Sequence, residues 1–178
     1  MNTSNPYAGE RRAGTVGPAL PGVQLRVVDD QGLAVSAGAI GGIQVKGPNV
    51  FKGYWRMPEK TAEEFTTDLW FKTGDVGRID ADGYVSIVGR SKDLIISGGY
   101  NVYPAEIEGC INALAGVAES AVVGVPHPDF GEVGVAVVVA QPGAVLDAAA
   151  ILSELRTRIA HYKVPRQVFV VAELPRNA

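Results

Sequence analysis

The chain has 178 residues, of which 47% are apolar and 20% are charged, and its formal net charge is −3 at pH 7. This length is enough for one ordinary domain or two small ones with packed cores. The acidic balance provides no broad basic field for a phosphate backbone, so we expect no nucleic-acid partner. No run approaches the ~20 apolar residues that cross a bilayer, and no signal pattern opens the chain, so we expect a cytoplasmic protein without membrane contact.

Cysteine and histidine are too few for a metal site of their own. Cys110 is the only cysteine, which excludes an internal disulfide and a four-cysteine site. His127 and His161 form no metal-ligand or catalytic-triad pattern, so we interpret both as structural or exposed. Lys163, Arg166 and Arg176 form a loose basic region, which we interpret as a solvated face to which a nearby phosphate would be attracted.

The first half of the chain reads as β-structure. Short apolar or alternating runs, divided by glycine and proline, predict strands at 24–28, 43–46 and 84–88. Acidic residues and a glycine predict chain reversals at 29–32 and 81–83. Pro58 before strong helix formers predicts a short helix over residues 58–65. We expect a small antiparallel sheet or barrel.

The pattern becomes mixed after Arg90. A helix opened by Pro104 is expected to end at Gly116, and a second one is expected to follow the capping residue Asp147. Apolar runs predict strands at 120–125, 133–140 and 167–171, with a loop or turn over 126–132. The fold class is therefore α+β, with a small β subdomain over residues 1–89 followed by a small α+β domain over residues 90–178.

Two charged residues of the first half are suited to a nucleoside. One strand-turn-strand unit separates Asp75 from Arg90 and predicts both side chains at the same end of the sheet. A carboxylate accepts hydrogen bonds from two neighbouring ribose hydroxyls, and a guanidinium donates to ribose or phosphate oxygens. The alternative is a turn aspartate paired with a surface arginine, which either residue alone would favour.

The order of these motifs resembles the adenylate-forming enzymes, which include acyl-CoA synthetases, luciferases and the adenylation domains of peptide synthetases. The resemblance is carried by Thr73-Gly74-Asp75, by Gly89-Arg90-Ser91-Lys92-Asp93 and by Ser97-Gly98-Gly99-Tyr100-Asn101. It implies that Asp75 and Arg90 bind the ribose of ATP or AMP.

The same resemblance implies roles for the residues that follow. Lys92 stands at the hinge about which the C-terminal domain swings between two half-reactions, although a solvated lysine is the alternative. Gly98 and Gly99 match the stretch that lines the pantetheine path of CoA, although an ordinary turn explains a glycine pair equally well. Asn101 is a candidate for orienting the nucleotide or the loop.

The resemblance covers almost the whole chain but only the last part of such an enzyme. It implies that residues 1–89 are the C-terminal β-rich part of the large N-terminal domain, and that residues 90–178 are the mobile C-terminal lid domain without its last segment. The phosphate-binding loop is expected before Met1, and the catalytic lysine is expected after Ala178. The remainder of the parent synthetase is thus an expected partner, and the fragment alone is expected to be inactive.

Within the family, three segments look most like the bacterial malonyl-CoA synthetases: residues 1–6, 47–61 and 124–132. The implied reaction converts malonate, ATP and CoA to malonyl-CoA, AMP and pyrophosphate through malonyl-AMP, with Mg²⁺ accompanying ATP. Two alternatives stay open. One is a noncatalytic fragment that binds nucleotide or CoA, and the other is a synthetase for another short or aromatic carboxylate.

Overall fold

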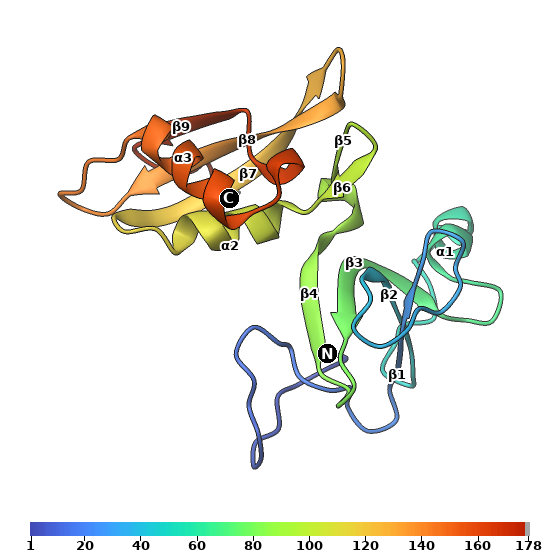
Figure 1. Ribbon diagram of the computed structural model, residues 1–178. Coiled ribbons are helices and arrows are strands. Elements are labelled where there is room, and N and C mark those ends of the chain that lie inside the picture. The colour runs from blue at the N-terminus through green and yellow to red at the C-terminus, as the bar shows by residue number, and fades with distance from the viewer. Residues whose placement is uncertain (177–178) are drawn as a thin grey trace. The chain divides into compact units, whose positions relative to one another are not determined.

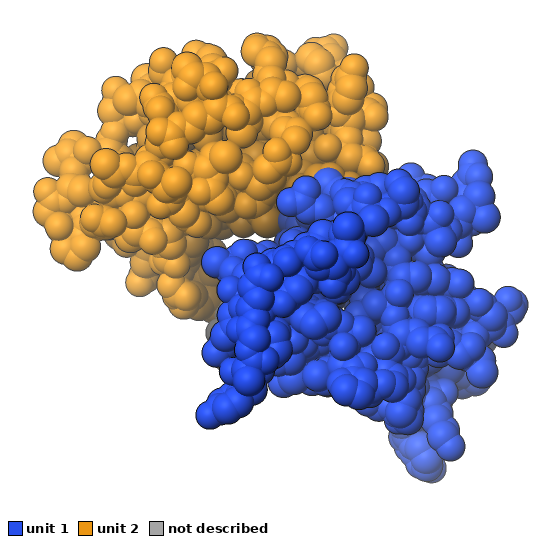
Figure 2. Space-filling view, turned by 60° about the horizontal axis from the view of Figure 1, so that its bottom comes forward, with its two compact units in different colours: residues 1–92 blue, residues 93–178 orange. Residues whose placement is uncertain are grey.

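The computed structural model describes residues 1–176 of the chain. They form two compact units, the first comprising residues 1–92 and the second beginning at Asp93 (Figure 2). Each unit has its own sheet and its own hydrophobic core. The α+β class expected from the sequence is confirmed.

The first unit is built on an open antiparallel sheet with the strand order β1-β2-β3-β4. Its core is formed by Val27, Ile43, Val45 and Val85, which are buried residues of β1, β2 and β4. No closed barrel is formed in the described part of this unit, so the sheet is the correct alternative. The elements are β1 (Gln24–Val28), β2 (Gly41–Lys46), α1 (Pro58–Glu64), β3 (Phe71–Ile79) and β4 (Val85–Arg90).

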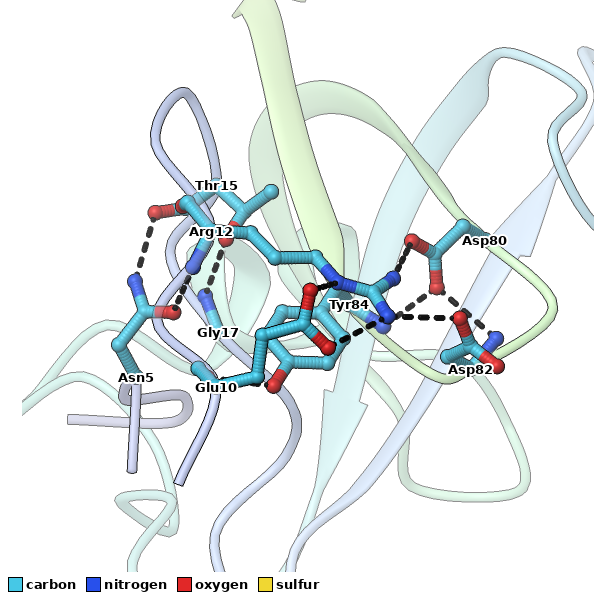
Figure 3. Close-up of polar contacts among 8 residues, drawn as sticks. All are labelled: Asn5, Glu10, Arg12, Thr15, Gly17, Asp80, Asp82 and Tyr84. Atoms are coloured by element: carbon cyan, nitrogen blue, oxygen red, sulfur yellow. Dashed lines mark hydrogen bonds and ion pairs between the residues drawn. The ribbon is translucent and has the colours of Figure 1, made fainter. Parts of the chain in front are cut away.

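The turn between β3 and β4 is fastened to the N-terminal segment by Arg12 (Figure 3). The guanidinium contacts Glu10 at 3.0 Å, Asp80 at 2.9 Å and Asp82 at 2.8 Å. It also lies over the ring of Tyr84, 4.2 Å from the centroid, and the Tyr84 hydroxyl donates to the Glu10 carbonyl at 2.7 Å. We call this group the Arg12 clamp; it joins two segments about seventy positions apart in the chain.

The second unit is a mixed sheet with helices on one face (Figure 1). The strand β8 lies at its centre, pairing with β7 along one edge and with β5 and β9 at different points of the other edge. The helices α2 and α3 bury Ile107, Ile111, Ile151 and Leu155 against the sheet. The short helix η1 (Ser91–Asp93) contains the division between the two units. The elements of the second unit are β5 (Ile95–Ser97), β6 (Tyr100–Val102), α2 (Pro104–Asn112), β7 (Val117–His127), β8 (Gly131–Ala140), α3 (Ala148–Arg158), η2 (His161–Lys163) and β9 (Gln167–Val171).

Two predicted boundaries of this unit were wrong. The loop or turn expected over 126–132 is confined to a turn at 128–130, because β7 runs on to His127 and β8 begins at Gly131. Pro126 is tolerated in β7 because this strand lies at the edge of the sheet. The first helix ends at Asn112, and Gly116 instead takes a positive φ of 81° in the turn that leads into β7. The cap at Asp147 is confirmed, since its side chain accepts a hydrogen bond from the Ala149 backbone at 2.9 Å.

Candidate functional site

Asp75 and Arg90 are cross-strand partners in the first unit. Asp75 lies on β3 and Arg90 at the end of β4, and their Cα atoms are paired in the antiparallel register. The Arg90 Nε lies 3.2 Å from the Asp75 Oδ1, with the carboxylate side chain 24% exposed and the arginine side chain 56% exposed. The contact uses one of five guanidinium donors and one of two carboxylate oxygens, so it exhausts the hydrogen-bonding capacity of neither side chain.

The backbone before Asp75 is held by Thr73. Its hydroxyl donates to the Ile43 carbonyl at 2.9 Å and accepts the Asp75 N–H at 3.0 Å. Gly74 between them has a φ of 75°, and its carbonyl accepts a hydrogen bond from the Ser91 hydroxyl at 3.2 Å. The Thr-Gly-Asp sequence is therefore a bend that is tied to β2 on one side and to the residue after Arg90 on the other.

Lys92 and Asn101 are not brought to this pair by any described contact. Lys92 lies exposed in η1 and is the last residue of the first unit. Asn101 belongs to the second unit, where it lies exposed on β6 opposite Ile96. The hinge role of Lys92 and the nucleotide contact of Asn101 stay predictions.

The second unit contains a cavity of about 290 Å³ beside the turn between β5 and β6. Aromatic rings and cationic side chains meet there, from the β5–β6 turn, the β7–β8 turn, α3 and η2. The lining residues are Ser97, Gly98, Tyr100, Phe130, Val133, Gly134, Arg156, His161, Tyr162, Val164, Pro165 and Arg166. Flat rings beside positive charge are suited to an aromatic ligand that carries phosphate. We call this site the aromatic cavity.

Gly98 lines the aromatic cavity, whereas Gly99 is absent from its described lining. Both have positive φ, 57° and 82°, as a two-residue hairpin turn between β5 and β6 requires. A Cβ on Gly98 would lie 3.2 Å from the Phe130 Cδ1, while a Cβ on Gly99 would meet nothing within 4 Å. Gly98 therefore also allows the Phe130 ring to approach the hairpin.

The basic region expected near the end of the chain is divided among different partners. Arg166 lies over the Phe130 ring, 4.9 Å from its centroid. Lys163 is paired with Glu106 of α2 and Arg176 with Glu119 of β7. Hydrogen bonding to Glu106 raises the pKa of Lys163 above its usual value. His161 lies in η2, which follows α3, and it lines the aromatic cavity.

Sequence reasoning missed the rings of this cavity. Tyr100, Phe130 and Tyr162 come from three distant segments, so no local spacing connects them. The available signal was that Tyr162 directly precedes Lys163 and that Phe130 directly precedes a glycine. Tyr162 thus lies beside the predicted basic region, and Phe130 lies within the loop or turn predicted over 126–132.

A larger hollow of about 1160 Å³ lies in the first unit, between β2 and β3 in sequence. Its described lining, within residues 46–69, contains no carboxylate and none of the predicted site residues. Within residues 1–176, no three His, Cys, Asp or Glu side chains are grouped as metal ligands. None of the helices in that range is both long and apolar enough to cross a membrane.

Two family models match the chain. The model described as AMP-binding enzyme matches residues 1–55, and the model described as AMP-binding enzyme C-terminal domain matches residues 106–178. Among solved structures, ATP-bound MatB from Rhodopseudomonas palustris is 60% identical, with a TM-score of 0.96 over 99% of this chain and 35% of its own. The amide bond synthetase McbA from Marinactinospora thermotolerans is 39% identical, with a TM-score of 0.86 over 91% of this chain and 33% of its own.

Curated relatives are CoA ligases for different carboxylates. An indoleacetate–CoA ligase of Aromatoleum aromaticum is 47% identical over 97% of this chain and 34% of its own. A malonate–CoA ligase of Arabidopsis thaliana is 40% identical over the whole of this chain and 31% of its own. The chain thus spans about a third of the length of the relatives it matches. It belongs to the family of AMP-binding, adenylate-forming enzymes.

Proposed function

We propose that the chain is the part of an ATP-dependent carboxylate–CoA ligase that binds the nucleotide ribose and CoA. In this reaction a carboxylate oxygen attacks the α-phosphorus of ATP, which forms an acyl adenylate and releases pyrophosphate. The CoA thiolate then attacks the acyl carbonyl, and AMP leaves. The observation that carries the proposal is the pairing of Asp75 with Arg90 at one end of the sheet.

The ribose is assigned to this pair because the two side chains offer complementary groups side by side. The Asp75 carboxylate accepts hydrogen bonds from the two ribose hydroxyls, and the Arg90 guanidinium donates to the ribose or the α-phosphate. Asp75 and Arg90 share a single contact of 3.2 Å on a partly exposed surface. Such an ion pair is weak, so a ribose that bonds to the same atoms loses little free energy by displacing it. In the parent enzyme, Mg²⁺ would accompany ATP and balance its phosphate charge.

CoA is assigned to the second unit. Its adenine suits the rings of the aromatic cavity, and its phosphates suit Arg156 and Arg166 in the lining. Gly98 and Gly99 are the proposed contacts of the pantetheine arm, supported by the lack of side chains at the β5–β6 turn. Lys92 is proposed as the hinge between the two half-reactions, because the two compact units divide directly after it.

Malonate is the carboxylate that we propose first. The support is the resemblance of residues 1–6, 47–61 and 124–132 to bacterial malonyl-CoA synthetases, together with a malonate–CoA ligase that aligns with the whole chain. An aromatic carboxylate is the second candidate, because the indoleacetate–CoA ligase is more similar at 47% identity. An assay of the parent enzyme with malonate and indoleacetate in competition decides between them.

Calorimetric titration of the chain with AMP tests the ribose site. We expect saturable binding that Asp75→Asn and Arg90→Met each weaken at least about tenfold, because each removes charge-assisted hydrogen bonds. Asp30→Asn and Arg11→Met are matched controls, since both residues are exposed and distant in sequence from the pair. Equal AMP affinity in all five proteins would refute the ribose assignment.

A second assay separates a ligase part from a noncatalytic binding fragment. We expect the parent enzyme to release pyrophosphate and form acyl-CoA, and its Asp75→Asn variant to lose most of that activity. The chain of residues 1–178 is expected to bind AMP without turnover. A parent that binds AMP and CoA yet forms no acyl-CoA with any carboxylate would favour the noncatalytic alternative.

A further inference from the structure

Tyr100 stacks on Tyr162 in the aromatic cavity. Their ring centroids are 4.7 Å apart and their planes meet at 26°. Resting on the proposed CoA site, we propose that Tyr100 occupies the position of the CoA adenine on Tyr162, as a displaceable competitor that sets the affinity of the cavity for adenine-bearing ligands. The Tyr100 ring leaves when the base binds and returns when it dissociates.

The geometry of this pair differs from that of the other aromatic contacts in the chain. In the first unit, Phe51 packs edge-on against Tyr54, Phe65 and Phe71, at interplanar angles of 72–78°. Both arrangements are ordinary for aromatic side chains, but near-parallel stacking is the one that a purine base adopts on a phenol ring. Tyr100 thus covers Tyr162 in the way that a bound base would.

Tyr100 is also placed so that it can move. Tyr100 is 59% exposed, and it directly follows the glycine pair of the β5–β6 turn. Tyr162 is held more firmly, because it belongs to η2 and the adjacent Lys163 is bonded to both carboxylate oxygens of Glu106. Of the two stacked rings, Tyr100 is therefore the one to be displaced.

The second fixed ring of the cavity is already paired with a charge. The Arg166 guanidinium lies over Phe130, 4.9 Å from the ring centroid. Arg166 is thereby positioned beside the base site, where it can receive a phosphate while Tyr162 receives the base. A ligand with an aromatic base and phosphates competes with Tyr100, whereas a phosphorylated ligand without a base does not.

Calorimetry on the chain with two probes tests this inference. CoA carries the adenine, and 4′-phosphopantetheine lacks it. We expect Tyr100→Ala and Tyr100→Leu to lower the Kd of CoA by about two- to tenfold, the value of one aromatic stack, and to leave the Kd of 4′-phosphopantetheine unchanged. Tyr100→Phe keeps the competing ring, so its CoA affinity should equal that of the original chain.

Proton NMR supplies a readout that a purely structural role would not move. Saturation with CoA should shift the Tyr100 ring resonances towards those of an unstacked tyrosine, and 4′-phosphopantetheine should not. A CoA Kd that is unchanged or raised in both ring-free variants, while the original chain binds CoA and Arg166→Met weakens that binding, would overturn the inference and leave the proposed function intact. Failure of the original chain to bind CoA would overturn both.

Discussion

Lys163 donates hydrogen bonds to both carboxylate oxygens of Glu106, at 2.6 and 2.8 Å, and so joins η2 to α2. The side chain of Lys163 is 19% exposed, which limits its screening by solvent. We expect Lys163→Met to lower the free energy of unfolding of the second unit by about 1 kcal/mol. Chemical denaturation measures it. Glu154→Gln is the control, because its partner Arg158 is 41% exposed on the same helix and the loss should be below about 0.5 kcal/mol.

The same ion pair predicts a pH dependence. Hydrogen bonding to Glu106 raises the pKa of Lys163 above 10.5 in the folded state. A cation whose pKa is raised by folding contributes its full stabilisation at pH values below its pKa in the unfolded state. That stabilisation is lost as the pH rises through its pKa in the folded state. Between neutral pH and 10.5, the difference in unfolding free energy between the original chain and Lys163→Met should therefore be constant, and it should shrink above 10.5. A difference that grows in alkali would contradict the pairing.

Thr73 should act on the nucleotide site through Asp75. Thr73→Val removes the hydroxyl that bonds the Ile43 carbonyl and the Asp75 N–H while keeping the side-chain shape. We expect a loss of about 1 kcal/mol in stability and about a fivefold rise in the Kd of AMP. Thr73→Ser should restore both quantities. Unchanged AMP affinity in a destabilised Thr73→Val variant would show that the bend does not position the carboxylate.

The two glycines of the hairpin turn should differ when each receives a methyl group. Gly98→Ala and Gly99→Ala both place alanine at positive φ, which costs about 1 kcal/mol. Only Gly98→Ala also sets a Cβ 3.2 Å from the Phe130 ring. We therefore expect the larger stability loss and a changed Phe130 environment in Gly98→Ala, measured by denaturation and by ring resonances in NMR. Equal effects would mean that the ring yields without cost.

The Arg12 clamp should loosen in acid. Arg12 lowers the pKa of Glu10 below 4.5, and the Tyr84 backbone N–H, followed by other donors that include Arg12, lowers the pKa of Asp80 below 3.8. A carboxylate whose pKa is lowered by folding contributes its full stabilisation at pH values above its pKa in the unfolded state. That stabilisation is lost as the pH falls through its pKa in the folded state. The hydrogen-exchange protection factors of residues 10–17, which correct for the intrinsic exchange rate at each pH, should fall below about pH 4. Arg12→Met should show low protection factors already at neutral pH, and Arg11→Met should not.

Local chemistry made the regular elements predictable. The strands 24–28 and 167–171 agree with β1 and β9 at both ends, because turn formers bound each apolar run. The helix expected over 58–65 is confirmed as α1, which begins at Pro58 and ends at Glu64. The turn between β3 and β4 was also predictable, although Asp80 supplies the hydrogen-bonding carboxylate.

Tertiary context decided what the sequence could not predict. The strands β5 and β6 have three residues each, too few for a periodic pattern, and only the turn between them was anticipated. The pairing of Asp75 with Arg90 followed from one hairpin, whereas the aromatic cavity needs four segments to meet. A stacking partner such as Tyr162 lies sixty-two positions from Tyr100, and nothing in either neighbourhood specifies the other.

The β5–β6 hairpin is anchored unequally along its length. Ile95 and Val102 at its base are 1% and 2% exposed in the core, whereas its tip joins β8 through the single register pair Ser97 and Gly131, with a hydrogen bond from the Gly98 N–H to Phe130. The base should therefore open only when the whole unit unfolds, whereas the tip can open locally at a small cost in free energy. The tip, which carries the two glycines and the Tyr100 ring, is therefore the more weakly held end of the hairpin.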